Sequence, residues 1–241
     1  MSGGSDVTKI LVLMNTYTPG HLDSRQSAVL AATSSAVEVD FAEVAESRGG
    51  GATTNFHRAA VAIAFARRAA AAEAAGYDAV VPWGTLDLGV EEARHLTSIP
   101  VIGPGRTATN VAASLVDRYG VMVYGADQVV MFRKLLHAWG AESHVVGIGH
   151  VDLRPMEMEG RRDELRQRFI AESRRLVDDG AELILPLGFS MIPVTLSAAE
   201  LTEELGIPVL DPLAIVMRVA EALATTGVRN SRVAYPHATL E

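Results

Sequence analysis

One short pattern occurs twice in the chain and limits how it can fold. Residues 76–84 read Gly-Tyr-Asp-Ala-Val-Val-Pro-Trp-Gly, and residues 180–188 read Gly-Ala-Glu-Leu-Ile-Leu-Pro-Leu-Gly. Each copy places an acidic residue and a short apolar run between two glycines, with a proline near the end. A second match, Ile-Pro-Val-Ile at 99–102 and Ile-Pro-Val-Leu at 207–210, follows in the same order. The repeat predicts two half-molecules of similar plan, in which the second glycines of the two copies hold matched positions.

The apolar runs and the segments between them predict alternating strands and helices. The continuous apolar run from Ile10 to Met14 is typical of a parallel strand that is covered on both faces. Further strands are expected at 37–44, 79–81, 100–102, 121–124, 144–149, 183–187 and 208–210. Helices are expected at 24–33, 55–75, 87–97, 107–118 (with Thr107 as its cap), 127–138, 161–179 and 197–205, with a last long helix from 212.

This alternation predicts an α/β fold of two halves that are related by a pseudo-twofold axis. Each half would be a four-stranded parallel sheet flanked by helices, because β-α-β units with right-handed crossovers build parallel sheets. We assign residues 1–106 together with 212–241 to the first half, and residues 107–211 to the second. Ligands of such sheets bind beyond the carboxyl ends of the strands. A cleft between the halves is therefore the expected site.

The composition is typical of a globular α/β protein, with 49% hydrophobic residues and 21 glycines. The formal net charge of −8 argues against a nucleic-acid partner. The apolar run at 10–14 is too short for a signal peptide or a membrane span, which predicts a cytoplasmic protein with no membrane partner. Apolar faces on the alanine-rich helices are compatible with a homo-oligomer.

The sequence contains no cysteine, which excludes disulfides, thiolate chemistry and cysteine-ligated metals. Its histidines lack the spacing of metal ligands, so no metal is expected. The segment Gly103-Pro104-Gly105 resembles a phosphate-binding turn, but its proline lacks an N–H that a pyrophosphate would need. No cofactor is therefore expected.

The matched glycines, Gly84 and Gly188, each stand at the end of an expected strand. A glycine at such a turn leaves the backbone N–H uncovered, and a helix N-terminus favours negative charge, so two such turns can hold a carboxylate or a developing enolate oxygen. Thr85 and Ser190 add hydroxyl donors nearby. The alternative is that the two glycines only permit tight turns.

Two residues are predicted to be catalytic. Asp87 follows the first matched glycine by three residues, and Tyr124 ends its strand on the ligand side. The alternatives are a cap on the following helix for Asp87 and core packing for Tyr124. Tyr17 is a further acid–base candidate. The remaining candidates are His57, His150 and Asp211, for which a surface histidine or a helix cap is the favoured interpretation.

The order and spacing of several residues resemble a known superfamily. The matching positions are 76–81, Asp87, Gly89, Ala93-Arg94, 99–103 and 205–211. On these residues the chain, from Ile10 to about Leu223, resembles the aspartate/glutamate racemase superfamily, and within it the hydantoin racemase-like branch. Asn15-Thr16 falls where that family has an Asn-Thr loop that helps to hold the substrate.

This resemblance implies a cofactor-independent fold with two catalytic cysteines, one in each half, on opposite sides of the substrate's α-carbon. The present chain would carry Gly84 and Gly188 at those positions, so two-thiol racemisation cannot occur. It also resembles the arylmalonate decarboxylase and maleate isomerase branches. The decarboxylase branch has glycine followed by threonine, as in Gly84-Thr85, but it keeps the second cysteine, which this chain lacks. Tyr124 falls where both branches have a substrate-contacting tyrosine.

We therefore expect an enzyme that acts beside the carbonyl of a small carboxylate or of a cyclic imide or amide. Its mechanism would use no cysteine, and the outcome would be isomerisation, decarboxylation or hydrolysis. The alternative is a catalytically retired homologue that binds a small anionic ligand. The expected substrate-binding residues are Asn15, Thr16, Tyr17, Gly84, Thr85, Gly125, Gly188, Phe189 and Ser190.

Overall fold

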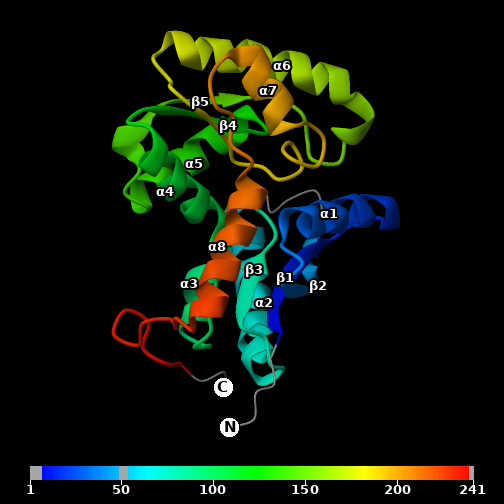
Figure 1. The fold of residues 1–241 in the computed structure, drawn as a ribbon, viewed down its shortest axis with the longest axis vertical. Coiled ribbons are helices and arrows are strands. Elements are labelled where there is room, and N and C mark those ends of the chain that lie inside the picture. The colour runs from blue at the N-terminus through cyan, green and yellow to red at the C-terminus, as the bar shows by residue number, and fades with distance from the viewer. Residues whose placement is uncertain (1–6, 49–53, 239–241) are drawn as a thin grey trace.

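The computed structural model describes residues 7–48 and 54–238. Its first sheet contains the parallel strands β1 (Thr8–Thr16), β2 (Val37–Arg48) and β3 (Ala79–Pro82), in the order β2-β1-β3 (Figure 1). The apolar run predicted as the first strand therefore lies at the centre of this sheet.

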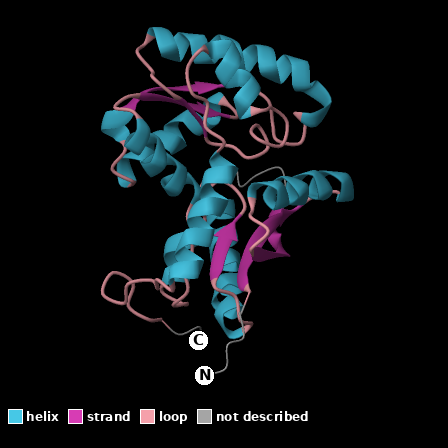
Figure 2. Cartoon of the chain, viewed as in Figure 1, coloured by secondary structure: helices cyan, strands magenta, loops and turns pink. Residues whose placement is uncertain are grey.

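The second sheet repeats this arrangement. It contains the parallel strands β4 (Tyr119–Val123), β5 (Val145–His150) and β6 (Ile184–Pro186), in the order β5-β4-β6. Figure 2 shows the two sheets as separate layers with helices around each. The predicted α/β class with two similar halves is confirmed.

The two copies of the sequence repeat occupy the same place in the two sheets. Pro82, at the end of β3, pairs with Leu13 of the central strand β1. Pro186, at the end of β6, pairs with Met122 of the central strand β4. Each repeat therefore ends its strand beside the central strand of its own sheet, and the matched glycine follows two residues later.

The expectation of four strands in each half was wrong. Residues 100–102 and 208–210 each form a single bridge, which pairs Val80 with Val101 and Ile184 with Val209. A proline at the start of each segment has no N–H to donate to a sheet, and a second proline begins a helix shortly afterwards. Each segment is therefore too short and too poor in donors to continue as a strand.

The helices follow the predicted order with changed boundaries. They are α1 (Pro19–Ala32), α2 (Asn55–Ala74), α3 (Val90–Arg94), α4 (Pro104–Leu115), α5 (Ala126–Ala138), α6 (Arg162–Asp178), α7 (Ala198–Leu205) and α8 (Pro212–Thr226). The expected helix at 87–97 shortens to α3 because Asp87 and Gly89 adopt positive φ angles of 52° and 77°. The helix expected from Thr107 begins instead at Pro104, which suits the first helical position.

Helix α8 returns from the second half to cover the first sheet. Its residues Val216 and Met217 are buried with Ile10 and Val12 of β1. Figure 1 shows this helix running alongside β3. These contacts support the inclusion of α8 with the first half, and we keep the division into 1–106 with 212–241 and 107–211 as a proposal.

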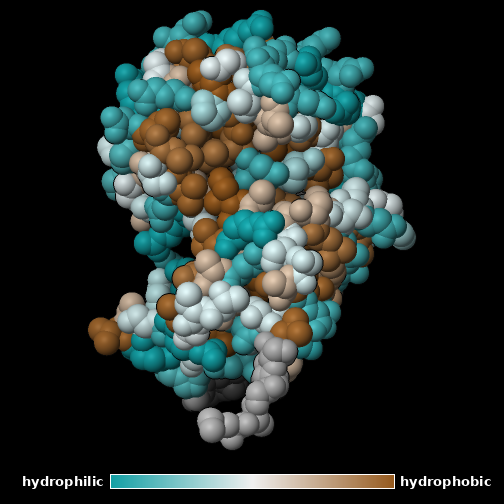
Figure 3. All heavy atoms as spheres, in the orientation of Figure 1, coloured by the Kyte–Doolittle hydropathy of each residue, from teal (hydrophilic) through white to brown (hydrophobic). Residues whose placement is uncertain are grey.

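The surface carries scattered apolar side chains. Figure 3 shows apolar residues gathered over part of the second half on the face in view. The exposed large hydrophobic side chains within helices include Phe56 and Ile63 on α2, Leu115 on α4 and Val130 on α5. None of the helices within 7–48 and 54–238 is long and apolar enough to cross a membrane.

A buried arginine joins the two halves. Arg25, on α1, is 0% exposed, and its Nη1 donates to Oε1 of Glu159 at 2.6 Å. Its Nη2 donates to Oγ of Ser190 at 3.1 Å, so α1 is tied to two segments of the second half. The guanidinium also lies 4.5 Å above the ring of Tyr17. A buried charge is costly unless it is paired, so these contacts fix how the halves meet.

We predict that Arg25→Met lowers the free energy of unfolding by about 2–4 kcal/mol, because it removes hydrogen bonds made by a buried charge. Urea denaturation measures the effect. Arg175→Met is the matched control, since the side chain of Arg175 is 49% exposed and pairs with Glu172 and Asp179 on its own helix and at its end. The control should change stability by no more than about 0.5 kcal/mol. Equal effects of the two substitutions would contradict the structural role of Arg25.

Candidate active site

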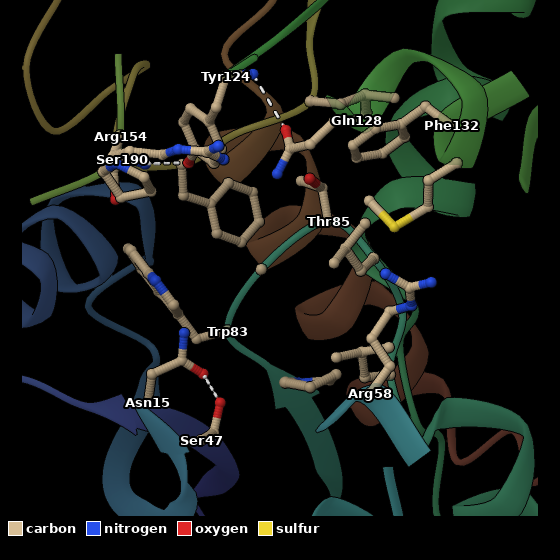
Figure 4. Close-up of a pocket in the computed structure, with 18 of the residues that line it drawn as sticks. Asn15, Ser47, Arg58, Trp83, Thr85, Tyr124, Gln128, Phe132, Arg154 and Ser190 are labelled. Carbon is tan, nitrogen blue, oxygen red and sulfur yellow. Dashed lines mark hydrogen bonds between the residues drawn. The ribbon is translucent and has the colours of Figure 1, made fainter. Parts of the chain in front are cut away.

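A cavity of about 120 Å³ lies where the two halves meet. This is many times the space of about 10–15 Å³ that a single water needs. Both halves contribute to its wall (Figure 4). The polar and charged lining residues are Asn15, Tyr17, Ser47, Arg58, Thr85, Tyr124, Asp127, Gln128, Arg154 and Ser190, and the apolar ones include Phe65, Trp83, Leu86, Met131, Phe132 and Phe189.

On the side of the first half, a hydrogen-bonded chain begins at the end of β1. Ser47 Oγ donates to Asn15 Oδ1 at 2.6 Å, and Asn15 Nδ2 donates to the hydroxyl of Tyr17 at 3.2 Å. Trp83, directly before the matched glycine, donates from Nε1 to the same hydroxyl at 3.0 Å. The ends of β1, β2 and β3 thus present one connected polar group to the cavity.

The first matched glycine leaves this wall open. Gly84 has a φ angle of 108°, in the region that favours glycine, and no heavy atom lies within 4 Å of the position that a Cβ would take. Thr85 follows it and is 4% exposed. The turn therefore exposes backbone atoms and the Thr85 hydroxyl to the cavity. The space that a side chain at position 84 would occupy is free.

The second matched glycine is covered by a tyrosine. A Cβ at Gly188 would lie 2.5 Å from Cζ of Tyr124 and 2.7 Å from its hydroxyl oxygen. The backbone N–H of Ser190 donates to that hydroxyl at 3.2 Å (Figure 4). The phenol of Tyr124 therefore fills the space into which a side chain at position 188 would project.

Tyr124 is held in its neutral form. Burial raises the pKa of the Tyr124 phenol well above its ordinary value, and the charge on an ionised Tyr17 would raise it further. Hydrogen bonds from Ser190 and the charge of Arg25 act in the opposite direction but do not overcome burial. Near neutral pH the Tyr124 phenol is accordingly a proton donor and not a base.

Positive charge predominates among the described lining residues. Arg154 Nη1 donates to Oδ2 of Asp127 at 3.2 Å, so these two charges largely cancel. Arg58, on α2, donates through Nη2 to Asn55, which is uncharged. This bond leaves the positive charge of Arg58 unbalanced at the wall of the cavity. The Oε1 of Gln128 accepts from the Tyr124 backbone N–H at 3.1 Å, and its amide NH₂ is directed toward the cavity (Figure 4). This lining suits an anion or a carbonyl oxygen.

The structure brings together most of the residues predicted to bind substrate. Those that line the cavity are Asn15, Tyr17, Gly84, Thr85, Phe189 and Ser190, and Tyr124, which was predicted to be catalytic, lines it as well. Thr16 instead directs its hydroxyl to the Val44 carbonyl at 3.4 Å, Gly125 precedes α5, and Gly188 lies behind the Tyr124 ring. These three are outside the lining of the cavity.

Asp87 lies outside this cavity, in a neighbouring groove of about 360 Å³. Its carboxylate accepts from the backbone N–H groups of Gly105 and Arg106, at 2.6 and 2.9 Å. Asp87 therefore caps α4, and not the helix that directly follows it in the chain. Burial raises the pKa of Asp87 to about 7, against the lowering effects of these two bonds and of Arg94 and Arg106.

The weaker acid–base candidates also lie elsewhere. His57 is exposed in the first turn of α2, and His150 ends β5 with its ring 3.1 Å from Asp152. Asp211 accepts from the backbone N–H groups of Leu213 and Ala214 and caps α8, as its favoured interpretation predicted. Among the described residues, no group of three or more histidine and acidic side chains is placed to hold a metal ion.

Several lining residues were missed from the sequence. Arg58, Gln128 and Arg154 belong to helices and loops in which charged and polar residues are common, so no motif marks them. Trp83 directly precedes Gly84 in the first repeat, and this adjacency was the one available signal. The sequence around Arg25 contains no motif that marks this residue. Only its contacts with Glu159 and Ser190 show that it joins the two halves.

Comparisons with known proteins agree on one family. The family model described as Asp/Glu/Hydantoin racemase matches residues 10–220. A hydantoin racemase of Rhizobium meliloti is 30% identical over 168 residues, which cover 68% of this chain and 68% of that protein. The structure of an allantoin racemase from Klebsiella pneumoniae has a TM-score of 0.82 at 25% identity, covering 97% of this chain and 96% of that one.

A more distant likeness extends to decarboxylases. A liganded mutant of arylmalonate decarboxylase has a TM-score of 0.64 at 17% identity, over 95% of this chain and 97% of that one. Identity this low shows a common fold alone. The superfamily resemblance that the residues indicated is confirmed by the family model and by the hydantoin racemase relative.

We predict a pH-dependent stability that originates at Asp87. The folded protein holds the Asp87 proton up to a pKa of about 7, whereas the ordinary value is 3.8. The folded state thus binds more protons between these values, and the free energy of unfolding should fall as the pH rises from about 4 to about 7, by up to about 1.4 kcal/mol per pH unit. Asp87→Asn removes this titration and keeps one capping oxygen.

Urea denaturation at pH 5 and pH 8 checks this expectation. Asp87→Asn should gain stability relative to the unaltered protein on going from pH 5 to pH 8. Asp163→Asn, at an exposed position of α6, is the control and should show no such gain. An equal stability difference between Asp87→Asn and the unaltered protein at both pH values would contradict the raised pKa.

Proposed function

The chain belongs to the Asp/Glu/hydantoin racemase family, and on this premise we propose that it is an enzyme acting beside the carbonyl of a small carboxylate or of a cyclic imide or amide. Its mechanism uses no cysteine, because the sequence has none. The observation that carries the proposal is that hydrogen-bond donors from both halves converge on one positively charged cavity.

The donors are suited to stabilise an enolate. When a bond to the carbon beside a carbonyl breaks, negative charge develops on the carbonyl oxygen, and donors that are already in place lower the barrier. The Thr85 hydroxyl and the Gln128 amide face this space, and Arg58 attracts an anionic group of the substrate. Apolar side chains such as Trp83 and Phe189, in edge-to-face contact at 5.1 Å, would hold an apolar substituent.

Tyr124 is the residue that we assign to proton donation. The Gly84 and Gly188 positions are where the resemblance implies the two thiols, and the Tyr124 hydroxyl lies within 2.7 Å of a Cβ at position 188. A neutral phenol there can give a proton to the substrate's α-carbon. In this proposal the Tyr124 hydroxyl lies close to the position at which the resemblance implies the second thiol, position 188.

Of the three outcomes, decarboxylation fits this lining best. Isomerisation needs a base as well as an acid, and the one carboxylate among the described lining residues, Asp127, is paired with Arg154. Decarboxylation needs no base: the bond to the leaving CO₂ breaks, its electron pair forms the enolate, and a proton from Tyr124 then completes the new C–H bond. Solvent returns a proton to the phenolate before the next turnover.

The second candidate is a binding protein without turnover. The specific observation in its favour is the absence of cysteine together with the neutral state of Tyr124, which leave the cavity rich in donors and poor in bases. A small carboxylate would then bind at Arg58 and remain unchanged.

We predict that the protein converts an aryl- or alkylmalonate in D₂O into a monocarboxylate that carries one deuterium, as followed by NMR. The test panel also contains 5-substituted hydantoins and allantoin. Tyr124→Phe should lower the rate by about 10²–10⁴-fold, the usual contribution of a proton-transferring side chain. Tyr119→Phe is the matched control, because it removes a buried phenol oxygen that lies outside the cavity.

The outcomes separate the candidates. Exchange of the α-hydrogen without loss of CO₂ would replace decarboxylation with isomerisation. Binding of a carboxylate, measured by calorimetry, without turnover of any compound would favour the binding protein. If Tyr124→Phe and Tyr119→Phe behave alike, Tyr124 is not the proton donor.

A further inference from the structure

The hydroxyl of Tyr17 has both of its acceptor positions occupied. It accepts from Asn15 Nδ2 at 3.2 Å and from Trp83 Nε1 at 3.0 Å. A phenolic hydroxyl has one hydrogen to give and two lone pairs, and an indole N–H can only donate. With both lone pairs in use, the remaining hydrogen of Tyr17 is free to be given to a group in the cavity that Tyr17 lines.

A second layer of bonds sets this direction. Ser47 Oγ donates to Asn15 Oδ1 at 2.6 Å, which turns the carboxamide so that its NH₂ faces Tyr17 (Figure 4 shows the Ser47–Asn15 bond). Ser47 is only 7% exposed, and Asn15 is partly buried. Water therefore competes little for the hydrogen bond between them. The network therefore selects one orientation of the Asn15 amide before any ligand arrives.

The ring of Tyr17 is also fixed from above. The guanidinium of Arg25 lies 4.5 Å from the ring centroid, a cation–π contact with a fully buried cation. Arg25 is itself held by Glu159 and Ser190. The ring is thus restrained by contacts independent of those that restrain its hydroxyl.

We propose that Tyr17 is a catalytic residue whose hydroxyl donates a hydrogen bond to the oxyanion that develops on the substrate's carbonyl group. This inference rests on the proposed function and adds to it a specific donor from the first half, whereas Tyr124 belongs to the second half. A donor that is oriented in advance loses no energy to reorientation during the reaction, which is the physical basis of oxyanion stabilisation. Tyr17 stabilises charge, and Tyr124 supplies the proton.

The network offers a substitution that reverses the hydrogen bond at Tyr17. Asn15→Asp has the same shape but replaces the donating NH₂ by an accepting oxygen, so the Tyr17 hydrogen turns toward position 15 and away from the cavity. Asn15→Ala removes the same partner without capturing that hydrogen. Tyr17→Phe removes the donor altogether.

Turnover of the malonate substrate is the first measurement. Tyr17→Phe should lower kcat by about 10²–10³-fold, as expected for the loss of one oxyanion donor. Asn15→Asp should fall to a similar level, and Asn15→Ala should lose less than Asn15→Asp. Tyr119→Phe, whose hydroxyl is buried without a hydrogen-bond partner among the described residues, should keep the full rate.

Binding of unsubstituted hydantoin, measured by calorimetry, is the second measurement. It excludes the explanation that Asn15→Asp acts only by repelling an anionic substrate. Hydantoin carries no full charge at pH 6, so the added negative charge of Asn15→Asp does not repel it. Loss of one neutral hydrogen bond predicts about three- to tenfold weaker binding to both Tyr17→Phe and Asn15→Asp. Urea denaturation establishes that each variant is folded.

Two results would overturn the role of Tyr17 and leave the proposed function intact. One is a Tyr17→Phe protein that keeps kcat within twofold of the unaltered chain. The other is an Asn15→Asp protein that binds hydantoin as tightly as the unaltered chain does. An unaltered chain that neither binds nor converts any compound of the panel would overturn the proposed function itself, and this inference with it.

Discussion

The burial of one guanidinium governs how the two halves of this protein meet. Arg25 belongs to the first half, yet the carboxylate that balances its charge and the hydroxyl that accepts from its Nη2 come from the second. A charge removed from water must keep such partners, so the halves cannot separate at this point without exposing it or leaving it unpaired. The same guanidinium lies over the Tyr17 ring, so the contact that joins the halves also shapes the wall of the cavity.

The cavity is defined more by donors than by charge. Its polar groups come from strand ends and from the turns that follow them, where a parallel sheet leaves backbone and side chains open to a ligand. Phenols, amides and hydroxyls there are fixed by hydrogen bonds from behind, as Ser47 fixes Asn15 and Ser190 fixes Tyr124. Donors that are fixed in advance can stabilise negative charge that develops on a bound ligand. The chemistry of such a site depends on which of its groups can donate a proton.

The sequence predicted the plan of the fold because the repeat is a local signal. Pro82 and Pro186 occupy corresponding places in the two sheets, as their matched positions required. The function of Asp87 could not be predicted in this way, because the helix that it caps begins far along the chain, at Pro104. Arg58 illustrates the same limit: an arginine on an alanine-rich helix is expected to be solvated, and only the fold shows that it lines a cavity to which both halves contribute. The glycines and the phenols of the site were visible from the sequence, but the cations were not.

The contact between Tyr124 and Gly188 has an evolutionary consequence. Because the phenol occupies the space beside the glycine, any side chain introduced at position 188 must first displace the ring. Changes at the two positions are therefore coupled, and their effects will not add. A lineage that holds this pair cannot gain a side chain at position 188 by one neutral step, since the ring at position 124 has to move or shrink as well. The packing of one glycine thus limits the single substitutions that the site can accept.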